Sequence, residues 1–195
     1  MKNFFAKPQL ILASIFLATA ALPVAAEPPD WANKNDVTIV GAAVALSGGL
    51  GDFDMNDEDF DILVAAVVAT GYAGDPLNGD DDYTVFAPID SAFLAAAGNP
   101  VDMNGNGSAE DEAVAILVGA FGLNGIRAVL DYHVTEGVRN SRSVLRAKKI
   151  TMRDGNTISA RDGFVDGNNS DADFVATDVR VLDGMIHVID GVLLP

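Results

Sequence analysis

Residues 179–195 read Val-Arg-Val-Leu-Asp-Gly-Met-Ile-His-Val-Ile-Asp-Gly-Val-Leu-Leu-Pro, and this closing stretch decides the fold. It contains two short apolar runs joined at Asp183-Gly184, a pair that accepts the positive φ of a tight hairpin turn. Side chains alternate along a strand, so the second run presents two sets of residues to opposite sides. Met185, His187 and Ile189 form one set, and Ile186, Val188 and Asp190 form the other. The sequence therefore predicts a terminal β-hairpin.

A second informative stretch is Tyr83-Thr-Val-Phe-Ala-Pro-Ile-Asp-Ser-Ala-Phe93. Its first four residues have strand chemistry, and Pro88 ends the strand because proline lacks the amide donor that a ladder needs. Asp90 is placed to cap a short helix that runs through Ala97 and is closed by Gly98. A third stretch, Leu130-Asp-Tyr-His-Val134, follows a helical region.

These three stretches, in this order over about 110 residues, resemble the motifs of fasciclin domains, a family of extracellular adhesion modules. Ile186-His-Val-Ile-Asp190, followed by Val-Leu-Leu-Pro195, is similar to the closing motif of the family. The resemblance covers residues 37–195. It implies a small β-sandwich wedge with a cluster of helices along one edge, and it implies no catalysis.

The remaining patterns agree with an α+β domain, because the expected helices come first and the strands come later. Helices are expected over residues 38–46, 60–68 with Gly71 as the stop, 111–121, and 125–131 with Asn124 as the cap. Strands are expected over residues 149–152, 157–160, 164–165 and 174–177, with a turn at Asp154-Gly155. No internal repeat is present, so residues 37–195 are expected to form one module.

The N-terminal 26 residues have the composition of an export signal. Lys2 and Lys7 provide a basic start, residues 10–22 are apolar but short for a membrane span, and Val24-Ala25-Ala26 suits cleavage. The alternative is a retained N-terminal anchor. Cleavage near Ala26 predicts a secreted, periplasmic or cell-surface protein without stable membrane insertion, in which the polar residues 27–36 form a flexible lead-in. The chain has no cysteine, which excludes disulfides, thiolate ligands and a lipoprotein anchor.

The chain is strongly acidic, with 12 Lys and Arg against 28 Asp and Glu and a formal net charge of −16. Without Lys2 and Lys7 the basic count falls to 10, and the charge becomes about −18. Such a surface argues against nucleic acid, whose phosphates need cationic partners, and against docking on anionic lipid. Two explanations of the acidity are open: it keeps the protein soluble, or it binds divalent cations.

Catalysis has little support in the sequence. There is no Gly-x-Ser-x-Gly elbow and no His-Glu-x-x-His spacing, and the glycines at 48–51 lack the lysine of a phosphate loop. The two histidines, His133 and His187, have no second imidazole or acid at ligand spacing, so they are expected to be partly buried and held by backbone groups. The alternative is a ligand or a pH sensor.

Two sets of candidate binding residues follow. The first set comes from the resemblance, which implies that Pro88, Asp90, Tyr132 and His133 are candidates for adhesive contacts. Phe86 and Phe93 are expected in the core.

The second set lies in residues 102–112, which resemble the start of an EF-hand or dockerin calcium loop, with side-chain oxygens at alternating positions. Its candidate ligands are Asp102, Asn104, Asn106, Ser108, Glu110 and Glu112. Ala113 occupies the twelfth position, where a bidentate glutamate belongs, so the alternative to calcium binding is a solvated acidic loop.

The sequence thus predicts a non-catalytic secreted domain that requires no cofactor. Its expected role is adhesion to a cell-surface or matrix protein or polysaccharide, including biofilm association, with calcium stiffening the acidic loops. The alternatives are a module that binds a small apolar ligand such as a carotenoid or lipid, and a purely structural envelope protein.

Overall fold

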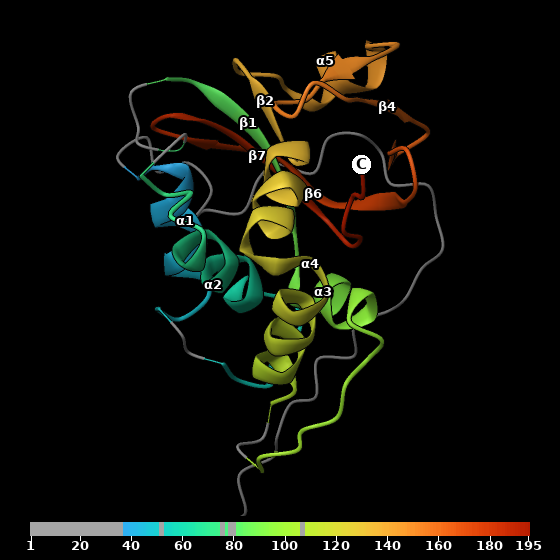
Figure 1. The fold of residues 1–195 in the computed structure, drawn as a ribbon. Coiled ribbons are helices and arrows are strands. Elements are labelled where there is room, and N and C mark those ends of the chain that lie inside the picture. Colours follow the sequence, from blue (N-terminus) through green and yellow to red (C-terminus); the bar gives the residue numbers. More distant parts are fainter. Residues whose placement is uncertain (1–36, 51–52, 75–76, 78–80, 106–107) are drawn as a thin grey trace, which may run out of the picture.

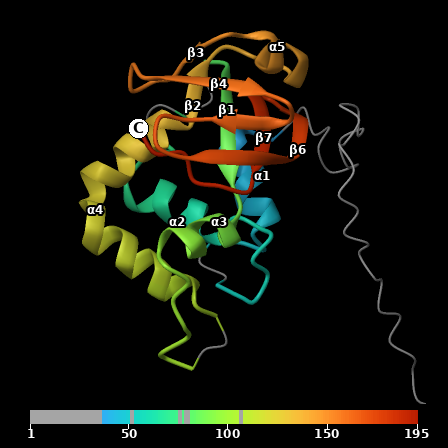
Figure 2. The same ribbon diagram turned by 90° about the vertical axis from the view of Figure 1, so that its right-hand side faces the viewer.

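The computed structural model describes residues 37–50, 53–74, 77, 81–105 and 108–195. The expected export signal and the lead-in lie outside these residues. The helices are α1 (Ile39–Leu46), α2 (Asp61–Ala69), α3 (Asp90–Ala96), α4 (Glu110–Tyr132) and α5 (Ser141–Arg146). Figure 2 shows α1, α2, α3 and α4 gathered on one side of the strands, with α5 on the other side.

Seven strands form one curved, nearly barrel-like sheet in the order β2-β1-β7-β6-β5-β4-β3 (Figure 1). They are β1 (Tyr83–Pro88), β2 (Val134–Glu136), β3 (Ile150–Thr151), β4 (Thr157–Arg161), β5 (Phe164–Asp166), β6 (Asp171–Val181) and β7 (Gly184–Ile189). Strands β1 and β7 pair in parallel, and the other pairs are antiparallel. The predicted α+β class and the helix cluster are confirmed.

Strands β1 and β7 are buried along their whole length because both faces of this part of the sheet are covered. Val85 and Val188 belong to the core shared with helices α1–α4. Phe86 and Ile189 point to the opposite face, into a second core with strands β3–β5 and α5. The predicted alternation along residues 185–189 is therefore confirmed, with both faces apolar as expected for a sheet covered on both sides.

The terminal hairpin forms, but its turn lies one residue earlier than Asp183-Gly184. Val181 pairs with Gly184, so Leu182 and Asp183 are the turn residues. Gly184 has φ 154° and is the first residue of β7. A Cβ built there would lie 1.9 Å from the Tyr83 carbonyl oxygen. The glycine is thus required by the close approach of β1, and the sequence pattern alone mistook it for a turn residue.

Helix α4 is bent at Gly122, whose φ of 64° and ψ of 169° are not helical. The curve of α4 around the other helices is visible in Figure 2. The sequence predicted two helices here, and the break between them is confirmed. The second half begins directly after Gly122, so Asn124 does not cap it. The sequence patterns did not predict helix α5 or strand β2. The side chain of Asn140 caps α5 by accepting a hydrogen bond from Ser143 N.

Candidate functional site

The four residues carried over as adhesive candidates are all buried. Pro88 ends β1, where it pairs with Ile189, and the Tyr132, His133 and Asp90 side chains lie inside the domain. Their side chains therefore do not offer a surface to a macromolecular partner. Their part in adhesion stays a prediction, and the contacts below give each a structural role.

His133 joins the end of α4 to the C-terminal segment. Its Nδ1 lies 2.7 Å from the Val129 carbonyl oxygen, and its Nε2 lies 3.0 Å from Leu193 N. Since an amide can only donate, Nε2 is the acceptor and Nδ1 carries the proton. Burial lowers the pKa of His133 to about 4. The predicted structural role of this histidine is confirmed.

His187 is held in the same way on strand β7. Its Nε2 lies 2.9 Å from the Arg139 carbonyl oxygen, and its Nδ1 accepts from Asp178 N at 3.3 Å. Burial lowers the pKa of this imidazole too. The ring packs against Phe86 and Phe174, with centroids 5.6 and 5.8 Å away. Neither histidine is available as a general base, because each uses both ring nitrogens on the backbone.

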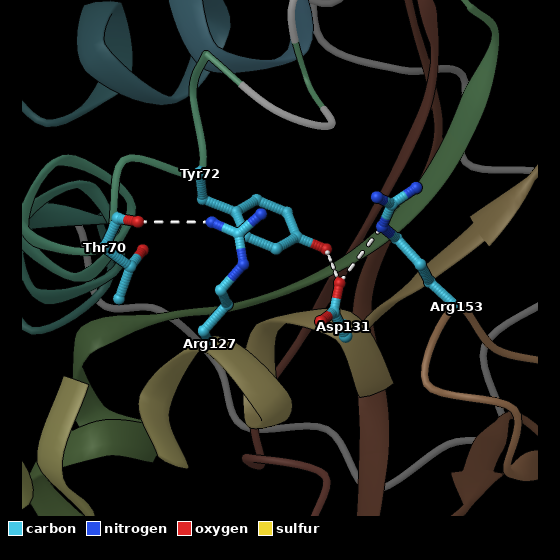
Figure 3. A network of polar contacts seen from close by, with 5 residues as sticks. All are labelled: Thr70, Tyr72, Arg127, Asp131 and Arg153. Carbon is cyan, nitrogen blue, oxygen red and sulfur yellow. Dashed lines mark hydrogen bonds and ion pairs between the residues drawn. The ribbon is translucent and has the colours of Figure 1, made fainter. Parts of the chain in front are cut away.

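Tyr72 lies at the centre of a polar network that the sequence gave no reason to expect (Figure 3). Its hydroxyl donates to Asp131 Oδ1 at 2.8 Å, and Arg153 Nε contacts the same oxygen at 3.1 Å. Arg127 stacks over the Tyr72 ring at 5.3 Å and donates to the Thr70 carbonyl at 3.2 Å. Burial raises the pKa of Tyr72, with Asp131 adding to the effect. The network fastens α2 to the end of α4.

Asp90 does not cap its own helix. It is the first residue of α3, and its carboxylate accepts from Asp61 N at 2.8 Å and from Ile62 N at 2.9 Å. It therefore caps α2, which has no side-chain cap from its own preceding residue Phe60. The prediction of a local cap was wrong because the unsatisfied amides of a neighbouring helix compete for the same carboxylate.

The candidate calcium loop divides into two parts. Asp102 and Asn104 are exposed; Asp102 Oδ1 accepts from Gly105 N at 2.6 Å, and the Asn104 amide contacts Asp111. Ser108, Glu110 and Glu112 are buried, and Glu112 Oε1 accepts from Met103 N at 3.0 Å. Asn106 lies outside the described residues. Calcium binding by this loop stays a prediction.

Glu110 points away from the loop into a pocket of buried carboxyl groups. Within the described part of the chain, one group of acidic and histidine side chains converges closely enough to share a metal ion, with ligand oxygens within 4.8 Å of one another. Its members are Asp59, Asp61, Asp90 and Glu110. Glu110 Oε2 also accepts from Asp54 N at 3.1 Å. We call these four residues the acidic pocket.

The acidic pocket strongly disfavours four simultaneous negative charges. Burial, together with a hydrogen bond to Asp59, raises the pKa of Asp90 to about 9. Burial, with the nearby charge of Asp61, raises the pKa of Glu110 to about 7. Loss of hydration penalises the ionised carboxylate, and a like charge adds to that penalty. The pocket can therefore take up protons or hold a cation with oxygen ligands.

The helix cluster also lines two apolar hollows that are partly open to solvent. A cavity of about 130 Å³ lies between α2, α3, α4 and the C-terminal residues. A second of about 80 Å³ lies between α1, α2 and the sheet. Beside the first, α4 leaves three large apolar side chains partly exposed: Ile116 (42%), Phe121 (48%) and Leu123 (49%).

Helix α4 is long and apolar enough by composition to cross a membrane, with 11% of its most apolar window buried. The break at Gly122 divides it into segments that are each shorter than the roughly 20 residues needed for a span. Its last turn is also fixed in the domain through buried Leu130 and Tyr132. These features favour a surface helix of the folded domain.

A family model for the fasciclin domain matches residues 58–195. Protein sll1483 of Synechocystis sp. is 31% identical over 114 residues, which cover 58% of this chain and 55% of that protein. The FAS1 domain pair of the insect cell adhesion molecule fasciclin I has a similar structure, with a TM-score of 0.59 at 14% identity. That match covers 82% of this chain and 51% of the pair, and at this low identity it bears on the fold alone. The chain spans about half the length of both proteins.

Proposed function

The chain belongs to the fasciclin family, whose domains are generally non-catalytic adhesion-type modules, and we propose that it acts as a secreted or cell-surface adhesion protein. The match over residues 58–195 is the observation that carries this proposal. The partner is a cell-surface or matrix protein or polysaccharide, including biofilm matrix. The expected export signal and the acidity of the chain support a location outside the cytoplasm.

The buried positions of Tyr132, His133 and Asp90 move the expected contact surface elsewhere. The exposed apolar side chains of α4 are the better candidate, because large apolar side chains gathered on one exposed helix are typical of an interaction site. Calcium belongs to this proposal as a stiffening ion, and as a bridge between acidic surface and anionic polysaccharide.

The test is attachment of beads coated with residues 27–195 to producing cells and their matrix, in calcium and then in chelator. Attachment in either condition supports adhesion, and calcium dependence adds the bridging role. Phe121→Glu is expected to reduce attachment. Val175→Glu, at a similarly exposed position on β6, is the matched control. Beads that fail to attach in both conditions contradict the proposal.

A second candidate function is binding of a small apolar ligand, favoured by the cavity of about 130 Å³ beside α4. An apolar cavity of roughly this size holds a benzene-sized molecule, so a carotenoid or lipid tail would extend beyond it. Protein isolated from its native host is the material to test. Solvent-extractable pigment or lipid, lost in an Ala66→Trp variant that fills the cavity, supports this function. Colourless, ligand-free protein contradicts it.

A further inference from the structure

The acidic pocket stands where three helices begin. Asp61, Asp90 and Glu110 are the first residues of α2, α3 and α4, and Asp59 lies just before α2. The segment before α2 is also attached here, because Ser91 N donates to the Asp57 carbonyl at 2.7 Å. Any group bound in the pocket would therefore hold three separate segments of the chain together.

All four side chains are removed from solvent. Glu110 is 1% exposed and Asp59 is 7% exposed, and Asp61 and Asp90 are fully buried. The donors to Asp59, Asp90 and Glu110 carry no positive charge: they are neutral N–H groups and the Ser108 hydroxyl, beside a hydrogen bond between Asp59 and Asp90 themselves. The N-terminal ends of α2 and α4 supply only partial positive charge. The negative charge of the pocket thus calls for a cation or for protons.

Two carboxyl oxygens distinguish this pocket from an ordinary acidic cluster. Asp59 Oδ1 and Glu110 Oε1 are buried and have no hydrogen-bond partner among the residues that the structure describes. The second oxygen of each is used, by Asn56 Nδ2 at 3.0 Å and by Asp54 N at 3.1 Å. A buried acceptor without a donor is rare in folded proteins and indicates that a water or an ion binds there. Asp59 and Glu110 therefore each keep one carboxyl oxygen free of donors in a pocket where their carboxylates converge.

The chemistry of the ligand set points to a hard divalent cation. Carboxylate oxygens are preferred by calcium and magnesium, and copper or zinc sites would normally include imidazole or thiolate. Opposite ligands of calcium lie about 4.6–5.2 Å apart, and those of magnesium about 4.0–4.2 Å. The pocket oxygens lie within 4.8 Å of one another, which leaves room for the larger ion.

We propose that Asp59, Asp61, Asp90 and Glu110 bind one calcium ion, which fastens the segment before α2 to the starts of α2, α3 and α4. This site is distinct from the 102–112 loop, since Glu110 is turned into the pocket. It does not depend on the adhesive function. Failure of bead attachment would leave calcium binding unaffected, and failure of calcium binding would leave attachment unaffected.

The experiment is calorimetric titration of chelator-stripped full-length protein with calcium chloride, together with thermal unfolding in calcium and in chelator. One calcium per chain and a rise in melting temperature are expected. Asp59→Asn and Glu110→Gln should each weaken calcium binding by at least about tenfold, because affinity follows the number of charged ligands. Glu136→Gln, which changes an exposed acid at the end of β2, is the matched control and should bind as the parent does. Asp102→Asn tests the loop as the alternative site.

A second measurement separates lost ligands from lost folding. Without calcium, Asp59→Asn and Glu110→Gln remove like charge from the pocket, so both are expected to melt at or above the temperature of the parent protein. Variants that melt well below the stripped parent overturn the proposal, since the carboxylates would then be structural. Loss of binding in Asp102→Asn alone overturns it in favour of the loop. If the parent binds no calcium, the proposal is overturned, and protons shared among the four carboxyl groups explain the pocket. If magnesium binds with equal affinity, the assignment to calcium is overturned.

Discussion

His133 Nε2 accepts a hydrogen bond from Leu193 N at 3.0 Å, which fixes the last residues of the chain to the end of helix α4. The imidazole must be neutral for this bond, because a protonated ring would have no lone pair to accept with. The Tyr-His motif and the closing motif are thus mechanically connected through one ring. The pH dependence of stability follows from that connection.

We expect stability to fall as the pH decreases from 7 to 5, by about 2 kcal/mol from His133 alone. The sign follows from the depressed pKa: the folded-state value is about 4 and the ordinary value is 6.5. The unfolded chain therefore binds a proton first, so the contribution is complete above pH 6.5 and is lost toward pH 4. Asp154 is the charged group that acts on the ring, in the opposite direction.

The measurement is urea unfolding at several pH values for the parent and for His133→Gln. The difference between the two should shrink as the pH falls, because the variant has no proton to take up at this position. Carboxylates that titrate in the same range cancel in the difference. A variant with the same pH slope as the parent would show that His133 is not buried in its neutral form.

Gly184→Ala is expected to destabilise the domain by at least about 3 kcal/mol, because its Cβ would lie 1.9 Å from a backbone oxygen that cannot move without opening β1. Gly49→Ala is the matched control, since Gly49 has φ 146° and nothing within 4 Å of its added Cβ. It should cost only the backbone strain, about 1–3 kcal/mol. Equal losses of unfolding free energy would mean that strain, and not the contact with Tyr83, requires the glycine.

Tyr72→Phe is expected to lower the free energy of unfolding by about 1.5–3 kcal/mol, because it removes a buried hydrogen bond to the Asp131 carboxylate. Arg153→Gln removes a partner of the same oxygen from a partly exposed position, where an ion pair contributes about 0–1 kcal/mol. Chemical denaturation of both variants and of the double variant gives their coupling. A larger loss for Arg153→Gln than for Tyr72→Phe would contradict this ranking.

The sequence predicted those parts of the fold that are encoded locally. The helix over 60–68 and its stop at Gly71 were predicted from apolar spacing and one glycine, and the alternation on β7 was predicted from period two. The hairpin turn was placed one residue late, because the requirement for Gly184 comes from β1, which is far away in the chain. Helix α5 was missed because its residues carry little apolar periodicity.

The acidic pocket could not be predicted, since its members come from three separate segments and no spacing rule relates them. Asp90 illustrates the difficulty: local reasoning assigned it to its own helix, and the fold brings α2 closer to its carboxylate. One member of the pocket did carry a signal. Asp90 is a lone acid between the apolar residues of β1 and those of α3, and such an acid is expected to be paired or bound.

The final prediction concerns the Tyr-His motif as a binding determinant. Tyr132 is fully buried, and its hydroxyl accepts from Asn168 N at 2.9 Å and contacts the Thr157 carbonyl oxygen at 3.3 Å. Tyr132→Phe should lower the free energy of unfolding by about 1–3 kcal/mol, because Asn168 N would lose its acceptor.

Bead attachment by Tyr132→Phe, measured well below its melting temperature, should equal that of the parent, whereas Phe121→Glu should attach less with little change in stability. The pair separates a structural role from an adhesive one, because the first variant changes only the interior and the second only the surface of α4. If folded Tyr132→Phe attaches less than the parent, the Tyr-His motif contributes to adhesion after all.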